Sequence, residues 1–362
     1  MEVEEGGNEV LVLPGGTMMP LHRKYTDYDW SPASKCMIGL ISKNAHAGFN
    51  DTMIDILTKK GPVTHPKGPY DKLTISKFAC SSIKIDDALL NKMGCPTVFG
   101  TKLTQTGRIV ITGTGTISIL NPRSQKIEMK YKRPLDFNHP GDTGFLKVKF
   151  FSTMPYCAFV DKKRSVCAFA GVTHLIFMKV NSRKVIKVAQ LGPLPQRAMN
   201  IYADQNGSGK ILMVFWPGTA RPHDNCHFIV YDSRRHVQHQ IMGPSLEPGN
   251  IEGKEKFTNG FFLNALFRGD TLVISMIFIV ESVKVYPLVH IIKLESAKDT
   301  KGKEILVPKI AKTFMKLELN VFCEVLDYNE EQHFLLVRDM TGTYKLDTDT
   351  GHLSTLQQIN CV

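Results

Sequence analysis

Short apolar runs separated by polar turns recur along most of the chain. The clearest copy lies at 108–127, where the apolar run 109–111 leads through a Gly/Thr turn to the run 117–120 and then to the polar turn 121–125. Segments 333–337, 341–346 and 347–353 repeat this plan near the end of the chain. Antiparallel hairpins that recur every few tens of residues indicate a radial β architecture, chiefly a β-propeller.

The pattern is steady from residue 99 onward and contains almost no helical periodicity. It divides into five strand-rich units near 99–135, 145–192, 199–242, 258–318 and 319–362. At ~40–50 residues per blade, 362 residues correspond to about seven blades, or to six with an N-terminal extension. We therefore predict an all-β chain: a single β-propeller of six or seven four-stranded blades over 25–362. Residues 1–24 are predicted as a flexible arm or a ring-closing strand, and whether 25–98 belong to the same ring stays open.

Residues 58–102 are predicted as an insertion that contains a loop and a short helix. Prolines and glycines interrupt 58–72, which indicates a loop. Residues 86–93 predict a helix, with Asp86 or Asp87 as its cap and Gly94 and Pro96 at its end. This segment either connects two blades or docks a partner through four apolar residues: Leu89, Leu90, Met93 and Phe99.

Three strands end in a pair that resembles the Trp-Asp pair of WD40-type repeats. The pairs are Leu120-Asn121, Tyr231-Asp232 and Leu346-Asp347, and each is followed by a polar turn. The chain has no Trp-Asp dipeptide and no Gly-His pair at the start of each blade. The resemblance implies a degenerate member of the WD40-type propeller superfamily.

The charge of the chain favours anionic partners. The formal net charge is +11 and the sequence pI is near 9.1, which favours nucleic acid, acidic protein segments or anionic lipid as partners. A soluble protein that simply carries positive charge is an equally good interpretation. If these charges lie at hairpin tips, they can contact a phosphate backbone together. The predicted anionic-partner contacts are Lys130, Tyr131, Lys132, Arg133, Lys162, Lys163, Arg164, Arg234 and Arg235.

The cysteines and apolar runs predict an intracellular protein, nuclear and/or cytoplasmic, without membrane insertion. None of the eight cysteines forms a C-x-x-C pair, and most lie in apolar runs, where a free thiol behaves as a small buried hydrophobe. No N-terminal apolar segment typical of a signal peptide is present. The longest apolar run, 271–280, is too short to span a bilayer as a helix, so we predict a buried strand there.

Residues that carry chemistry are sparse. The sequence contains no nucleophile elbow, phosphate-binding loop or dinucleotide fingerprint, and the cluster 223–227 lacks the further ligands that zinc requires. We therefore expect no enzyme, cofactor, metal or small-molecule substrate. The leading hypothesis is a scaffold that binds protein subunits within an intracellular multi-subunit complex. The alternative is a propeller subunit that binds RNA or another nucleic acid in a ribonucleoprotein assembly.

Overall fold

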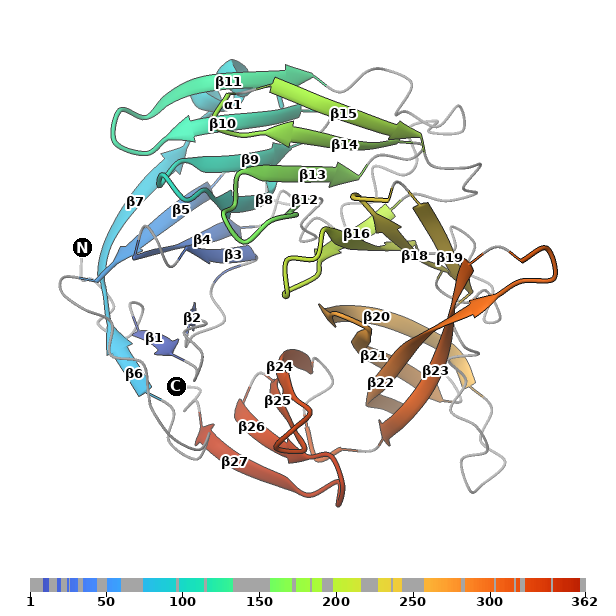
Figure 1. The fold of residues 1–362 in the computed structure, drawn as a ribbon. Helices are drawn as coiled ribbons and strands as arrows, with labels where there is room; N and C mark the ends of the chain where they lie inside the picture. Colours follow the sequence, from blue (N-terminus) through green and yellow to red (C-terminus); the bar gives the residue numbers. More distant parts are fainter. Residues whose placement is uncertain are drawn as a thin grey trace. The chain divides into compact units, whose positions relative to one another are not determined.

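The computed structural model of the protein consists almost entirely of strands. It describes residues 9–12, 18–20, 25, 27–31, 35–43, 51–59, 74–95, 98–113, 116–132, 157–170, 174–182, 184–190, 198–215, 227–235, 237–242, 257–280, 284–302, 304–315, 317–319, 323–339 and 341–358. These residues form 27 strands and one α-helix (Figure 1). The chain divides into two compact units, Met1–Pro193 and Leu194–Val362, and each sheet lies within one unit.

The first unit contains four antiparallel sheets. Three have four strands, in the orders β3-β4-β5-β7, β11-β10-β9-β8 and β12-β13-β14-β15, and one has three, in the order β2-β1-β6. The bounds are β1 Glu9–Val12, β2 Met18–Pro20, β3 Asp27–Ser31, β4 Cys36–Lys43, β5 Asp51–Thr58, β6 Thr74–Lys77, β7 Ala79–Ile85, β8 Val98–Leu103, β9 Ile109–Gly113, β10 Thr116–Asn121, β11 Lys126–Lys132, β12 Cys157–Phe159, β13 Val166–Ala170, β14 His174–Lys179 and β15 Lys184–Gln190.

The second unit contains three four-stranded antiparallel sheets, each a meander of consecutive strands. Their orders are β16-β17-β18-β19, β20-β21-β22-β23 and β24-β25-β26-β27. The bounds are β16 Ala198–Ala203, β17 Lys210–Phe215, β18 His227–Asp232, β19 Val237–Met242, β20 Phe257–Arg268, β21 Thr271–Val280, β22 Lys284–Lys298, β23 Glu304–Met315, β24 Glu324–Asn329, β25 Phe334–Arg338, β26 Gly342–Asp347 and β27 Leu353–Gln358.

These sheets confirm the predicted fold class, an all-β propeller of four-stranded blades. The five predicted units correspond to the sheets that begin at β8, β12, β16, β20 and β24. The predicted strand at 271–280 is β21, and its residues 271–277 are buried. The segment predicted as an insertion differs from the expectation, because part of it forms β6, β7 and β8. The loop predicted at 58–72 lies largely outside the described residues.

The three pairs that resemble Trp-Asp have a common structural role. Each one ends the third strand of a four-stranded blade: β10, β18 or β26. The side chain of Asp232 accepts hydrogen bonds from the N–H groups two and three residues ahead, at 2.9 and 3.0 Å. Asn121 and Asp347 do the same in their own turns. These residues therefore recur because each one closes the hairpin to the last strand of its blade.

The one helix of the described residues, α1 (Asp87–Met93), begins and ends at the predicted caps. Asp86 accepts a hydrogen bond from the Leu89 N–H at 2.8 Å, and Gly94, at φ 68°, ends the helix. The exposed fractions of Leu89, Leu90 and Met93 are only 8%, 5% and 0%, because all three pack in the apolar cluster that joins the sheets of β4 and β9. These residues are therefore core residues and not a partner-docking surface, and α1 is a connector. No helix of the described residues is long and apolar enough to cross a membrane.

Candidate functional site

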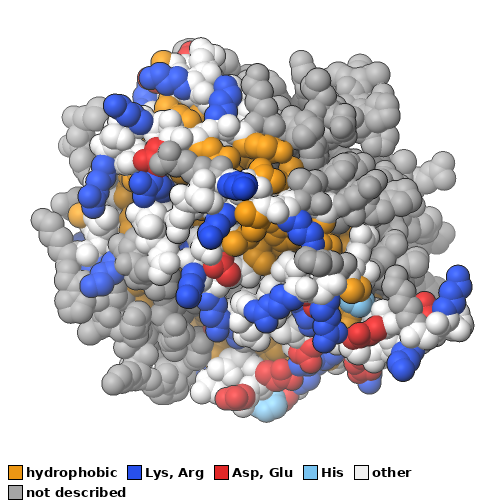
Figure 2. Space-filling model, turned by 45° about the horizontal axis from the view of Figure 1, so that its top comes forward, with side chains coloured by type: hydrophobic (Ala, Val, Ile, Leu, Met, Phe, Trp, Pro, Cys, Tyr) orange, Lys and Arg blue, Asp and Glu red, His pale blue; other side chains and the backbone are white. Residues whose placement is uncertain are grey.

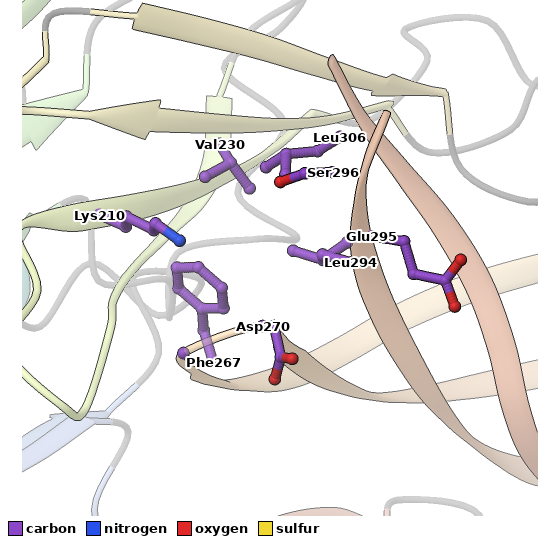
Figure 3. A pocket seen from close by; sticks show the side chains of 9 residues that line it. Lys210, Val230, Phe267, Asp270, Leu294, Glu295, Ser296 and Leu306 are labelled. Carbon is purple, nitrogen blue, oxygen red and sulfur yellow. The ribbon is translucent and has the colours of Figure 1, made fainter. Parts of the chain in front are cut away.

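A groove runs between two blades of the second unit, the β16–β19 sheet and the β20–β23 sheet (Figure 3). It consists of two adjoining cavities of about 400 Å³ and about 330 Å³. Both cavities are lined by Lys210 on β17, Val230 on β18, Ser296 on β22 and Leu306 on β23. We call this site the blade groove and define it by these four residues.

The floor of the blade groove is the edge of an apolar core. Val230, Phe267 and Leu294 line the larger cavity, and they belong to one apolar cluster that joins the two sheets. Their exposed fractions are 0%, 1% and 6%. In Figure 3, Lys210 and Phe267 extend toward the space bounded by Val230 and Leu294, whereas the carboxylate of Glu295 points away from it. The groove therefore has an apolar floor and a cation that reaches in from one side.

Hydrogen bonds between the two sheets fix the bottom of the groove. Asp204, in the turn before β17, accepts a hydrogen bond from the Gly269 N–H at 2.7 Å, and the Gln205 N–H donates to the Phe267 carbonyl at 3.0 Å. Burial acts to raise the pKa of Asp204, but hydrogen bonds from Ser208 and Gly269 outweigh it and lower that pKa below its usual value. The carboxylate is therefore ionised at neutral pH, and it holds the two turns together.

Arg268 links the three blades of the second unit. Its Nε and Nη2 donate to Oε1 of Gln205 at 3.1 and 2.7 Å. Its Nη2 also donates to Oδ1 of Asp327, and its Nη1 to the carbonyl of Tyr328, both at 2.7 Å. A guanidinium can make these bonds together because its donors are fixed in one plane. Arg268 therefore positions the end of β20, which carries the floor residue Phe267.

The acidic residues of the blade groove already have partners within the protein. Oδ1 of Asp232 accepts the N–H groups of Arg234 and Arg235, and Glu304 lies 3.4 Å from Nη1 of Arg235. Among the described residues, neither Lys210 nor the guanidinium of Arg234 contacts a carboxylate, and Nη2 of Arg234 donates only to the carbonyl of Gly207, at 3.1 Å. The groove is therefore left with two cations that lack an acidic partner.

Of the predicted anionic-partner contacts, Arg234 and Arg235 line the blade groove. In the first unit, Lys162 and Lys163 are exposed in the turn between β12 and β13. Lys130 and Tyr131 lie on β11, where the ammonium of Lys130 covers the C-terminal end of α1 at Gly94. The side chains of Lys132 and Phe99, and all of Arg133, lie outside the described residues.

Arg164 was predicted to contact an anionic partner, and the structure places it inside the first unit instead. Its Nε and Nη1 donate to the carbonyls of Leu103 and Trp30, both at 2.7 Å, and its Nη2 pairs with Asp29. The guanidinium also lies 4.6 Å from the ring centre of Phe159. Because its donors are used within the protein, Arg164 joins the sheets of β3, β8 and β12 and is not free to bind a partner.

The face shown in Figure 2 carries charges of both signs. On the face shown in Figure 2, Lys and Arg side chains are scattered, and near the lower edge they alternate with Asp and Glu side chains. The described residues of this face therefore present separate basic positions and not one continuous basic patch. This distribution favours local ion pairs over a track for a long phosphate backbone.

Sequence reasoning missed most of the blade groove. Lys210 opens an apolar strand, and Phe267 and Leu294 are ordinary core residues in the sequence, so nothing in their local pattern indicates a site. The part that the sequence did indicate is the Arg234-Arg235 pair in the turn after Asp232, which was predicted as an anionic-partner contact and lines the groove.

The described residues contain no group of three or more His, Cys, Asp or Glu side chains placed to hold a metal ion. The lining of the blade groove combines apolar side chains with ammonium, guanidinium, hydroxyl, imidazole and carboxylate groups. No protein-family model matches the sequence, and no curated protein is significantly similar to it.

Proposed function

We propose that this protein is a non-catalytic β-propeller scaffold that docks partner proteins within an intracellular multi-subunit complex, with the blade groove as a docking site. The observation that carries the proposal is the groove itself, which lies between two propeller blades and has an apolar floor beneath two cations. Grooves of this composition suit recognition of a protein segment, because apolar contact supplies affinity and a few polar groups set orientation.

The rigidity of the groove supports this function. Asp204 and Arg268 tie its two sides to each other and to the next blade through the hydrogen bonds described above. A preformed site loses little conformational entropy when a partner binds, so more of the contact energy appears as affinity.

The hydroxyl groups of the groove also fit a binding role. Ser208 accepts a hydrogen bond from the N–H of Lys210 at 3.2 Å, and Ser296 is exposed on β22. The side chain of Ser208 also forms a hydrogen bond with the carboxylate of Asp204, which helps to hold the turn before β17 in place.

The test is affinity purification of the tagged full chain from its native cells, with and without nuclease. We expect partners that resist nuclease and that disappear in Ser296→Trp, because the indole fills the groove from an exposed position. The matched control is Ser124→Trp, in an exposed turn of the first unit, which should keep every partner.

Loss of all partners after nuclease treatment would contradict the scaffold and favour the RNA-binding alternative. Partners that survive in Ser296→Trp would show that they dock elsewhere than in the blade groove.

A further inference from the structure

We propose that the blade groove binds an extended acidic segment of a partner protein, with Lys210 and Arg234 pairing with its carboxylates. The inference rests on the proposed function and names the chemistry of the partner. It follows from which charges in the groove have partners, from how deep the cations lie and from the shape of the two cavities.

The first step is the charge balance in the groove. Four acidic side chains line it, and each one has a donor from the protein. Asp232 and Glu304 are engaged as described above. Oδ1 of Asp270 accepts the Thr271 hydroxyl at 3.1 Å, and Glu295 lies 3.6 Å from Lys309 and points away from the cavity (Figure 3). Lys210 and Arg234 make no ion pair with a carboxylate among the described residues, so they are the cations of the groove that a carboxylate of a partner can engage.

The second step is the position of Lys210. This residue lies directly opposite Asp232 in the pairing of β17 with β18, and its side chain is half-buried beside Phe267 and Val230. A carboxylate that reaches Lys210 is partly shielded from water by the apolar floor. Such a pair is stronger than one between fully exposed side chains, because water and salt screen it less.

The third step is the form of the groove. One cavity extends toward Phe267 and Asp270 and the other toward Arg234 and His239, with Lys210 and Leu306 in the shared part. Lys210 and Arg234 are thus separate contact points along one channel. This arrangement fits an extended segment with successive acidic residues, and Leu306 offers an apolar contact to a residue between them.

The test uses the purified full chain and two fluorescent ten-residue peptides, read by fluorescence anisotropy. One peptide alternates glutamate with leucine, and the other has glutamine in place of glutamate. We expect the glutamate peptide to bind at least roughly tenfold more tightly than the glutamine peptide, which is the effect of one lost ion pair of about 1.4 kcal/mol. No binding, or equal binding of both peptides, would overturn the proposal.

Charge-reversal variants make the test specific to the groove. Lys210→Glu and Arg234→Glu should each weaken binding of the glutamate peptide roughly tenfold. Lys163→Glu, in an exposed turn of the first unit, makes the same change in net charge. Its affinity for the glutamate peptide should stay within about twofold of the wild-type value. Unchanged melting temperatures confirm that the variants fold. Equal weakening by all three would show general electrostatic attraction and overturn the proposal.

A charge swap provides the most direct outcome. The double variant Lys210→Glu/Arg234→Glu should bind a peptide of alternating lysine and leucine more tightly than the wild type does. An RNA decamer that binds the wild type more tightly than the glutamate peptide, and loses affinity in Lys210→Glu, would assign the groove to nucleic acid instead.

The two proposals can fail separately. Cellular partners that are lost in the Ser296→Trp variant but kept in the Lys210→Glu variant would show that the groove docks a partner without an ion pair to Lys210. That result would contradict the acidic-segment inference alone. If partners remain in both variants, the groove is not the docking site.

Discussion

At the residue scale, two arginines, one in an inter-strand turn and one at the end of a strand, hold neighbouring blades together. Arg164 does so in the first unit and Arg268 in the second, each with carbonyl groups and one carboxylate as acceptors. Arg164 has a positive φ of 50°, whereas its neighbours Lys162 and Lys163 point into solvent. In the sequence all three look like one basic turn, because the acceptors of Arg164 lie on strands far away in the chain.

We expect Arg164→Lys to lower the free energy of unfolding by about 1–3 kcal/mol, because a lysine cannot replace the directional bonds of the guanidinium. Urea denaturation measures this change. Lys163→Ala in the same turn removes an exposed charge and should stay within about 0.5 kcal/mol of the wild type. Similar stabilities of the two variants would show that the bonds of Arg164 contribute little.

His290, on β22, predicts a pH dependence of stability. It is 1% exposed, and burial lowers its pKa from 6.5 to about 4. Above pH 6.5 the imidazole is neutral in both the folded and the unfolded chain. It therefore does not change the free energy of unfolding with pH in that range. As the pH falls below 6.5, the unfolded chain binds the proton first, so stability is lost until the pH reaches about 4.

Between pH 7 and pH 5 this loss should amount to about 2 kcal/mol. His290→Gln should be less stable at pH 7 but should lack this part of the pH dependence, as measured by urea denaturation at both pH values. His352→Gln, at an exposed position, should keep the pH dependence of the wild type. If His290→Gln also keeps it, other groups cause the acid sensitivity.

At the element scale, the caps of α1 determine where the helix begins and ends. Asp86→Ala removes the acceptor for the Leu89 N–H and should lower the free energy of unfolding by about 1 kcal/mol. Asp87→Ala changes a neighbouring acid that does not cap the helix and should have a smaller effect. Chemical denaturation compares the two, and equal losses would mean that charge near the helix start matters more than the capping bond.

The sequence was sufficient for elements whose signals are local. Alternating apolar residues and turn residues located the sheets from β8 onward, and the caps located α1. The edge strand β7 was not predicted from the sequence. Four of its residues, Ala79, Cys80, Ser81 and Ser82, are all exposed, so the alternation of buried and exposed residues that marks a half-buried strand is absent there. The blade groove could not be predicted from local patterns, because its four defining residues lie on β17, β18, β22 and β23 and meet only in the folded chain.

At the scale of the whole molecule, the net charge of +11 should act on the rate of partner binding. A positive protein attracts an acidic segment over a distance that salt shortens. We expect the association rate of the glutamate–leucine peptide to fall several-fold between 50 and 200 mM salt, roughly the range over which screening becomes strong, with a smaller change in its dissociation rate. Stopped-flow fluorescence separates the two rates. A salt effect confined to dissociation would contradict long-range attraction.

The hairpin of β22 and β23 has a part buried in the core and an exposed part that lines the groove. Its residues from Leu288 to Ile292 are buried in the core, whereas Ser296 and Glu304, near its tip, are exposed and line the groove. If the groove docks a partner as proposed, substitutions at the tip will alter which segment binds without loss of stability. Related chains could diverge in partner choice through a few changes at this tip, while the blades beneath it remain the same.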